Sequence, residues 1–198
     1  MSPAHVVEPT YEAIKRRLMA GGWVPGSRLE SAKIADQLGV SVTPVRDCLY
    51  RLAGERMVDF SHGDGFHAHR LSETEYRDML ELHLILLLAA LATTPRGRAT
   101  PAPQDGDYPD RTAGLFIEMA ARSGNGELVA SITALGDRLH LARHLDEQLV
   151  GETVAELDAL AAALTSGPPH ETRNLLLRYH ERRAGEAASY ARLLGGAS

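Results

Sequence analysis

The sequence contains a single cysteine and no long run of apolar residues, and both absences limit the class of protein it can be. Cys48 has no second cysteine to pair with, and its place in an apolar helical pattern predicts a small buried side chain. The longest apolar run, Leu80–Ala92, contains Glu81 and His83 and is shorter than the roughly eighteen residues of a membrane-spanning helix. Met1–Val7 has neither the basic nor the apolar part of a signal peptide. We therefore expect a cytoplasmic protein with no membrane partner.

The chain also lacks an excess of basic residues, so any nucleic-acid-binding part must be recognised from where the charges lie. The formal net charge of the 198 residues is −5. Up to Arg70, nine Lys or Arg stand against eight Asp or Glu, so the acidic excess lies in the second half. A chain of this length with 44% hydrophobic residues can bury two modest cores. We expect two domains, residues 1–70 and 71–198.

The stretch Pro25–Leu52 predicts two short helices joined by a tight turn. Gly39 stands where the first helix should end in a left-handed conformation, and Val40 should fill the corner. Ser41 or Thr43 can cap the second helix. The apolar residues that should face inward from the two helices are Leu29, Ile34, Ala35, Leu38, Val45, Leu49 and Leu52. The pattern is that of a helix-turn-helix.

The second helix leaves Arg46 and Tyr50 on its outer side, which suits contact with DNA. A guanidinium can bind a guanine edge with two hydrogen bonds, while the hydroxyls of Ser41 and Thr43 and the first helical N–H groups bind phosphate oxygens. Arg28, just before the first helix, is a further candidate phosphate contact. Two amphipathic helices with a glycine corner also occur in ordinary helical proteins, so the neighbouring segments must decide between the two interpretations.

Segments on both sides complete a winged domain. Thr10 follows Pro9 and is expected to open a helix that Gly21 ends. After the second helix, Met57–Phe60 predicts a short strand, a glycine-rich turn follows, and Phe66–His69 predicts the returning strand. The expected result is a helix-turn-helix with a two-stranded wing.

Three segments of residues 10–70 together resemble the winged helix-turn-helix domain of the GntR family of bacterial transcription regulators; they are TYEAIKRRLMAGGWVPGSRL, IADQLGVSVTPVRDCLYRL and HGDGFHAH. The resemblance implies that Arg46 and Arg51 face DNA and that His62 with Gly63 forms the wing tip, which approaches the minor groove. Where the family usually has an arginine this chain has Val42, so one base or phosphate contact is missing.

The second half predicts an antiparallel helical bundle. Ser72 and Glu75 form a capping box, and the long helix that follows to about Thr93 is apolar on almost every face, so a bundle and a partner subunit should cover it. Thr94–Asp110, rich in Pro, Gly and Asp, predicts an irregular connection. Further helices are expected over residues 112–122, 126–150, 152–164 and 170–194. The fold class is therefore mainly α, a winged helix-turn-helix followed by a helical bundle.

Two later segments, LFIEMAARSGNGELV and ALAAALTSGPPHETRNLLLRYHERR, are separated by a long predicted helix. In this order they are similar to the FCD-type effector-binding domain that often follows the GntR winged helix. That resemblance implies a divalent metal held by one Asp and three His, with an Arg and a Glu on the first helix beside it. At the four ligand positions this chain has Thr112, Phe116, Leu157 and His180, so we expect no metal and no other cofactor there. The interior should be either packed core or a dry cavity for a hydrophobic effector. The expected pocket residues are His83, Leu87, Phe116, Leu157, Tyr179 and His180.

A second group of polar residues also suggests a metal. Asp137, His140 and His144 lie on one side of a predicted helix, and histidines four residues apart can chelate a transition metal. Both histidines fall at the margin of the helix's apolar stripe, which favours solvated surface side chains. The sequence leaves open whether His140 and His144 bind a metal. No nucleophile-base pair, phosphate-binding glycine loop or pair of catalytic carboxylates is recognisable, so we do not expect an enzyme.

The sequence therefore predicts a transcription regulator, most often a repressor in such families, that binds a palindromic operator in double-stranded DNA as a homodimer. A small hydrophobic effector would modulate it. Two alternatives remain open: a metal-binding helical-bundle protein or enzyme with an incidental winged helix, and a protein-interaction module that uses the winged helix for docking.

Overall fold

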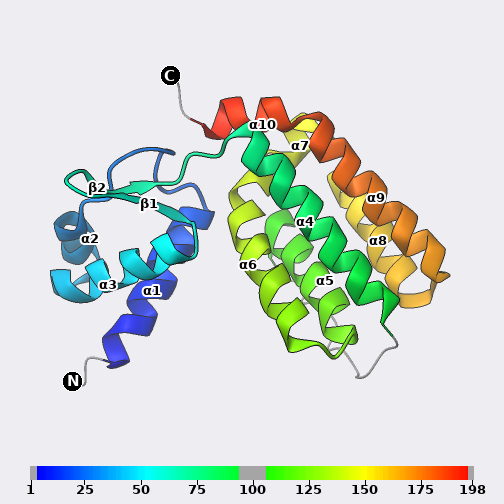
Figure 1. Ribbon diagram of the computed structural model, residues 1–198, viewed down its shortest axis with the longest axis horizontal. Coiled ribbons are helices and arrows are strands. Elements are labelled where there is room, and N and C mark those ends of the chain that lie inside the picture. Colours follow the sequence, from blue (N-terminus) through cyan, green and yellow to red (C-terminus); the bar gives the residue numbers. More distant parts are fainter. Residues whose placement is uncertain (1–3, 94–105, 196–198) are drawn as a thin grey trace. The chain divides into compact units, whose positions relative to one another are not determined.

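The computed structural model describes residues 4–93 and 106–195, which form two compact units. Among the described residues, the first unit runs to Leu71 and includes Leu194 and Gly195; the second runs from Ser72 to Leu193. Helices dominate both, and the sheet of the described part has two strands (Figure 1). No helix among the described residues is long and apolar enough to cross a membrane.

The first unit consists of three helices and a hairpin. The elements are α1 (Ala4–Met19), α2 (Ser31–Leu38), α3 (Val42–Gly54), β1 (Val58–Ser61) and β2 (Gly65–Ala68). The strands are antiparallel, with Val58 opposite Ala68 and Ser61 opposite Gly65, and an isolated bridge joins Arg28 to His67 beside them. The predicted two-stranded wing after the helix-turn-helix is confirmed.

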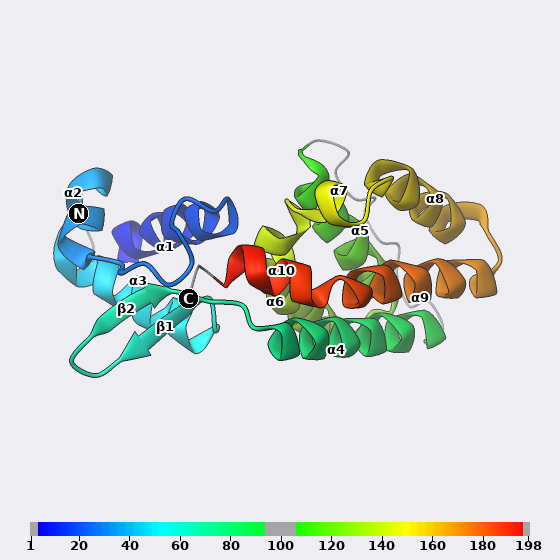
Figure 2. The same ribbon diagram turned by 90° about the horizontal axis from the view of Figure 1, so that it is seen from above.

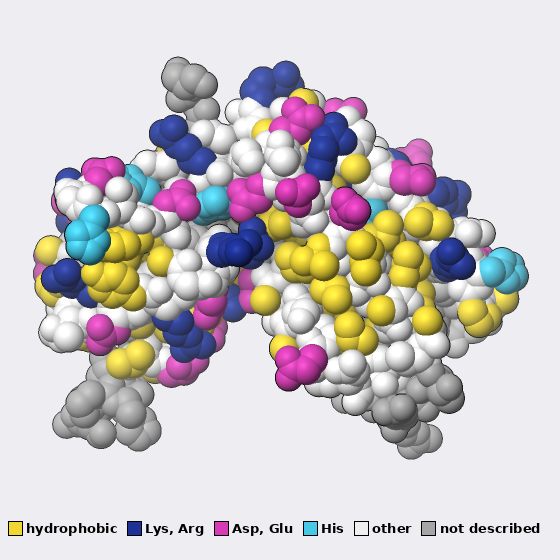
Figure 3. Space-filling view, viewed as in Figure 1, with side chains coloured by type: hydrophobic (Ala, Val, Ile, Leu, Met, Phe, Trp, Pro, Cys, Tyr) yellow, Lys and Arg dark blue, Asp and Glu magenta, His cyan; other side chains and the backbone are white. Residues whose placement is uncertain are grey.

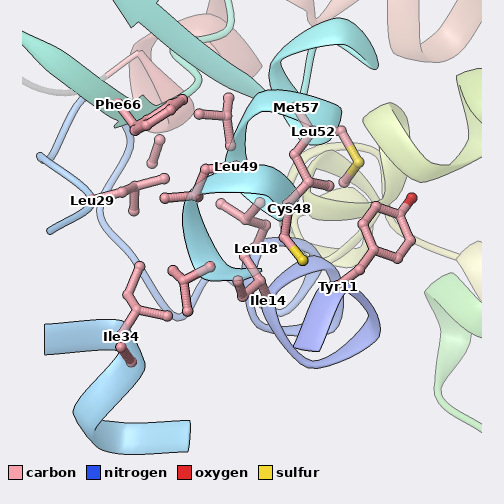
Figure 4. Close-up of a cluster of buried hydrophobic side chains, with 14 residues drawn as sticks. Tyr11, Ile14, Leu18, Leu29, Ile34, Cys48, Leu49, Leu52, Met57 and Phe66 are labelled. Carbon is pink, nitrogen blue, oxygen red and sulfur yellow. The ribbon is translucent and has the colours of Figure 1, made fainter. Parts of the chain in front are cut away.

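The core of the first unit lies between α1, α2, α3 and β2. Figure 4 shows Tyr11, Ile14, Leu49, Leu52 and Phe66 among the side chains that converge there. Each is at most 5% exposed. The single cysteine, Cys48, belongs to the same cluster and is 1% exposed, as its sequence context predicted.

The corner between α2 and α3 depends on Gly39. Its φ of 65° and ψ of 32° lie in the left-handed region that favours glycine, and its backbone N–H points back to the carbonyls of Ala35 and Asp36. Val40 then donates to the Ala35 carbonyl at 3.1 Å and packs against the core. Leu38, predicted on the buried face, remains 38% exposed.

The first helix begins earlier than the sequence suggested. It starts at Ala4 rather than Thr10 and carries Pro9 inside it. A proline removes one backbone hydrogen bond of a helix. Because Tyr11 and Ile14 are buried where α1 packs on α3, tertiary contacts hold the helix together across the proline.

The second unit is a helical bundle, seen from a second direction in Figure 2. Its helix α4 packs against α5, α6 and α9, while α8 packs against α5 and α9. The elements are α4 (Glu73–Ala92), α5 (Tyr108–Arg122), α6 (Gly126–Arg143), α7 (Asp146–Leu149), α8 (Thr153–Ser166), α9 (Pro169–Gly185) and α10 (Ala187–Leu194). Ser72 caps α4 by accepting a hydrogen bond from the Glu75 N–H at 3.1 Å, as predicted.

Several predicted boundaries in this unit are wrong. The helix expected from Thr112 begins at Tyr108, because Asp107 caps it through the Asp110 N–H at 3.1 Å and Pro109 fits its first turn. The helices expected over 126–150 and 170–194 are each two helices. The connection predicted over Thr94–Asp110 lies mostly outside the described residues, which resume at residue 106.

Candidate DNA-binding surface and bundle core

The outer side of α3 carries the polar residues that the sequence singled out. Val45, Cys48, Leu49 and Leu52 are buried, so one face of the helix is fixed against the core. Ser41 takes the N-cap position with extended backbone angles, and its hydroxyl makes no capping hydrogen bond. Ser41, Thr43 and Arg46 are all exposed. The hydroxyls, the first helical N–H groups and a guanidinium therefore share one accessible helix end.

Two of the predicted arginines are free to reach an anion. Arg46 and Arg28 are both accessible, and neither forms an ion pair with another residue in the described parts of the chain. Arg28 is tied to the wing through its backbone, which bridges to His67. Its side chain lies 3.8 Å from the place where a Cβ on Gly65 would stand. The Arg28 side chain thus approaches the turn end of the wing, whereas Arg46 lies on α3.

Tyr50 is half exposed and packs against aromatic residues of the wing. Its ring meets Phe60 at 5.1 Å and Phe66 at 4.8 Å between centroids, both edge to face. Phe60 is itself 40% exposed and lies 5.8 Å from the His62 ring. The predicted site did not include Phe60, because its place in a short strand with alternating faces indicated only that it belongs to the wing. Tyr50 therefore couples α3 to the wing.

Arg51 occupies a different environment from Arg46. Its guanidinium pairs with Glu8 at 3.0 Å and with Glu55 at 3.2 Å, and lies 3.6 Å from the centre of the Tyr11 ring. The resemblance implied a DNA-facing role for Arg51. In this structure the side chain is held against α1, and a DNA contact would have to replace these ion pairs.

The turn of the wing is open to its surroundings. His62 and Gly63 are exposed, and Gly63 has a φ of 88°, which an L side chain rarely adopts. Nothing lies within 4 Å of the position where a Cβ on Gly63 would stand. The tip can therefore approach another surface closely through its backbone.

In the second unit, the six predicted pocket residues come together as packed core. His83 Nδ1 lies 3.0 Å from His180 Nε2, and the Phe116 ring stands edge to face with His83 at 4.9 Å and with Tyr179 at 5.2 Å. Leu87 and Leu157 belong to the same cluster. Each of the six is at most 3% exposed, so their side chains are closed off from solvent. These six side chains are therefore part of the buried interior of the bundle.

Burial keeps the two core histidines neutral. Burial, then the charges of His180 and Arg143, hold the pKa of His83 well below its usual value. Burial lowers the pKa of His180 to about 4, although its Nδ1 pairs with the Leu176 carbonyl at 2.8 Å. His83 Nε2 is buried and has no hydrogen-bond partner among the described residues.

The donor set of this core does not fit the metal that the FCD resemblance implies. Thr112 donates its hydroxyl hydrogen to the Tyr108 carbonyl at 2.7 Å, and Phe116 and Leu157 offer no ligand atom. Both ring nitrogens of His180 already have neighbours at hydrogen-bond distance. One imidazole cannot hold a divalent ion against water.

His140 corrects one sequence-based interpretation. It was expected as a solvated surface histidine, yet it is 6% exposed, because α5 packs along α6 and covers it. His144 is exposed. Asp110 Oδ1 lies 3.7 Å from His140 Nε2, and Asp107 Oδ2 lies 3.9 Å from His144 Nδ1.

A buried ionic network at the end of the bundle was not foreseeable from the sequence. Arg183 is 1% exposed and pairs with Asp146 and Glu156, each at 2.8 Å. Asp146 also accepts hydrogen bonds from Tyr190 at 2.6 Å and Tyr108 at 2.9 Å. These residues are up to 82 positions apart along the chain, so no local spacing connects them.

Two helices at a left-handed glycine corner, an exposed second helix end and a two-stranded wing define a winged helix-turn-helix DNA-binding domain. Comparison with known proteins identifies its family, since residues 7–67 match the bacterial regulatory proteins of the gntR family. Residues 7–67 are thus a winged helix-turn-helix domain of the gntR type.

Two relatives in sequence are transcriptional regulators. The chain is 27% identical to the Nta operon transcriptional regulator of Aminobacter aminovorans over 63% of its own length and 67% of that protein. It is 30% identical to the HTH-type transcriptional regulator McbR of Escherichia coli over 40% of its length and 36% of McbR.

Solved structures share the fold across both units. The structure of E. coli McbR/YncC matches with a TM-score of 0.70 and 19% identity, covering 92% of this chain and 97% of the other. A putative GntR regulator from Rhodococcus sp. RHA1 matches with a TM-score of 0.72 and 15% identity, covering 97% and 99%. These likenesses concern the fold.

Proposed function

We propose that this regulator binds a palindromic operator in double-stranded DNA as a homodimer and represses transcription, with the α3 of each subunit in a major groove. The observation that carries the proposal is the exposed end of α3, where Arg46 is unpaired among the described residues and the Ser41 hydroxyl is not used as a cap. Arg46 would read a base edge, while Arg28, Ser41 and Thr43 would bind phosphate oxygens. The names of the Nta operon regulator and McbR support regulation of transcription.

The wing adds a second contact in this proposal. Gly63 lets the backbone at the tip come close to DNA, and His62 beside it is exposed. Tyr50 links α3 to the wing through Phe60 and Phe66, so both elements would meet DNA as one rigid surface.

A second copy of the chain would cover α4. Leu82 and Ile85 on this helix are 47% and 53% exposed, although most of its other apolar residues are packed in the bundle. Figure 3 shows hydrophobic side chains gathered over the part of the second unit that α4 crosses. A two-fold dimer places two α3 helices about one DNA turn apart, roughly 34–36 Å, which is the spacing that a palindromic operator needs.

A hydrophobic effector would act by opening the core around His83. The six pocket residues are packed, so binding requires a second arrangement of the bundle, and the ligand can shift that equilibrium only by its differential affinity. His83 Nε2, buried and without a hydrogen-bond partner among the described residues, supplies a polar anchor for such a ligand. Thermal-shift screening of lipophilic compounds against small carboxylic acids tests this part; selective stabilisation by the acids would contradict it.

Gel-shift assays with fragments of the source genome test the main proposal. We expect one or a few fragments to be retarded at concentrations where scrambled DNA is not, and footprinting to reveal an inverted repeat. Equal retardation of all fragments would contradict operator recognition, because it indicates binding without sequence preference. Retardation of no fragment would favour the docking-module or enzyme alternatives.

A further inference from the structure

A pair of carboxylates and a pair of histidines meet where the start of α5 lies along the end of α6. Asp107 and Asp110 come from the N-cap and first turn of α5, and His140 and His144 from the last turn of α6 and its C-cap. One ligand atom from each of Asp107, Asp110 and His140 lies within 4.8 Å of the other two. This cluster is separate from the Thr112, Phe116, Leu157 and His180 positions discussed above.

His140 is the observation that distinguishes this cluster from ordinary exposed acids. Its side chain is 7% exposed, and its Nδ1 is buried without a hydrogen-bond partner among the described residues. Its Nε2 faces Asp110 Oδ1 at 3.7 Å, which is too long for a hydrogen bond. A buried imidazole is thus aimed at a carboxylate without bonding to it.

The separations agree with ligands around one ion. Four atoms at the roughly 2.0–2.2 Å bond lengths of tetrahedral zinc lie about 3.4 Å from one another. The Asp110–His140 distance of 3.7 Å and the Asp107–His144 distance of 3.9 Å are close to that value. Ligand atoms of Asp107, Asp110 and His140 lie within 4.8 Å of one another, and His144 adjoins this group through Asp107.

Charge and protonation favour a cation here. Two carboxylates carry two negative charges, which a divalent ion balances. Burial, followed by the charges of Arg143 and His144, lowers the pKa of His140 to about 4, so the imidazole is neutral at pH 7 and has a lone pair to donate. The positive charge of Arg143 opposes the binding of a cation here. Its guanidinium donates a hydrogen bond to the Gly136 carbonyl at 3.3 Å.

We propose that Asp107, Asp110 and His140, with His144 as the fourth ligand, form a binding site for a divalent transition metal ion of the zinc class. Mixed carboxylate and imidazole ligands suit zinc and its neighbours better than calcium or magnesium. The ion would link the start of α5 to the end of α6. Nothing in this proposal depends on DNA binding or on the hydrophobic effector.

Zinc titration of the untagged full-length chain after chelator treatment tests the site. Titration calorimetry should give one zinc ion per chain. Thermal unfolding should have a higher midpoint with zinc than without it. Asp110→Asn and His140→Gln should each weaken zinc binding by about tenfold or more. Asp107→Asn, whose amide oxygen can still cap α5, and His144→Gln provide two further variants in case His140→Gln unfolds.

His170→Gln is the matched control, because His170 is an exposed histidine on α9, outside the cluster. It should bind zinc like the unchanged chain. Cobalt substitution adds a spectroscopic readout, since tetrahedral mixed-ligand cobalt absorbs more strongly than hexahydrated cobalt. Failure to bind zinc, or binding that survives both Asp110→Asn and His140→Gln, would overturn the proposal. Zinc lost only on His180→Gln would place the ion in the bundle core and overturn it equally.

Discussion

Arg46 and Arg28 provide a test of how base contacts and phosphate contacts divide on this surface. Arg46→Ala should abolish discrimination between operator and scrambled DNA, because one bidentate base contact contributes about 1–3 kcal/mol and the substitution removes it from both subunits of a dimer. Fluorescence anisotropy with both DNAs measures it. Discrimination equal to that of the unchanged chain would exclude Arg46 as the base-reading residue.

Arg28→Ala should weaken binding to both DNAs by a similar factor, since a phosphate contact carries no sequence information. The slope of log affinity against log salt should become shallower by about one for each arginine replaced, because fewer counterions are released from the DNA. The measurement is the same titration repeated at several salt concentrations. A changed sequence preference would show instead that Arg28 reads bases.

The buried histidines predict a loss of stability in mild acid. Histidines of the unfolded chain bind protons below about pH 6.5. In the folded chain, burial holds the pKa of His83 well below that value and lowers the pKa of His180 to about 4, so both stay neutral to lower pH. More protons are bound in the unfolded state between these values, so the free energy of unfolding falls as the pH drops from 6.5 towards 4. The positive charges of Arg143 and Arg183 act in the same direction.

Urea unfolding between pH 4 and 7 measures this slope, to which each neutral buried histidine adds up to about 1.4 kcal/mol per pH unit. His83→Leu should make the slope shallower, while His170→Gln, which changes an exposed histidine, should not. An identical slope in the His83 variant would contradict the assignment of acid sensitivity to the core pair.

At the scale of elements, the corner between α2 and α3 rests on one backbone conformation. Gly39→Ala should lower the free energy of unfolding by about 1 kcal/mol, because nothing lies within 4 Å of the added Cβ and only the positive φ opposes it. Gly54→Ala is the control: its position is also open, and it ends α3 without a positive φ. Denaturant unfolding that affects both variants equally would refute the conformational explanation.

The ionic network joins five helices at the end of the bundle, namely α5, α7, α8, α9 and α10. Arg183→Met leaves Asp146 buried without its main positive partner, so we expect a loss of about 3–5 kcal/mol of unfolding free energy. Arg178→Met, on the same helix but outside the network, should change stability little. A small effect of Arg183→Met by thermal and denaturant unfolding would mean that the network relaxes around the vacancy.

Elements with local signals were predictable and those set by distant contacts were not. Gly39, Ser72 and the alternation of the wing act within a few residues, and the predicted turn, cap and hairpin are all present. The start of α1 was misplaced because Pro9 suggested a boundary that packing on α3 overrides.

The same distinction applies to the sites. The exposure of Arg46 follows from helical periodicity on α3, so the sequence sufficed for it. The burial of His140 depends on α5 lying along α6. With Asp107 as its cap, α5 begins at Tyr108 and not at the predicted Thr112. The Asp110–His140 proximity, like the network around Arg183, could not be predicted from spacing.

For the whole molecule, the exposed apolar residues of α4 predict how two chains associate. Ile85→Glu should convert the expected dimer into a monomer, because a charge would be placed in an apolar interface without a partner. Asp78→Asn, an exposed change on the same helix, should leave it dimeric. Sedimentation of both full-length variants gives the answer; a dimeric Ile85→Glu chain would place the interface elsewhere.

The burial of Cys48 makes its thiol a built-in reporter of the opening of the first unit. The thiol is the sequence's one cysteine, it is 1% exposed, and burial raises its pKa, so a thiol reagent can reach it only when that unit opens. The rate of modification, divided by that of an unfolded thiol, then reports the free energy of opening of the winged-helix unit. Operator DNA binds only the closed unit and should slow the reaction in proportion to its occupancy.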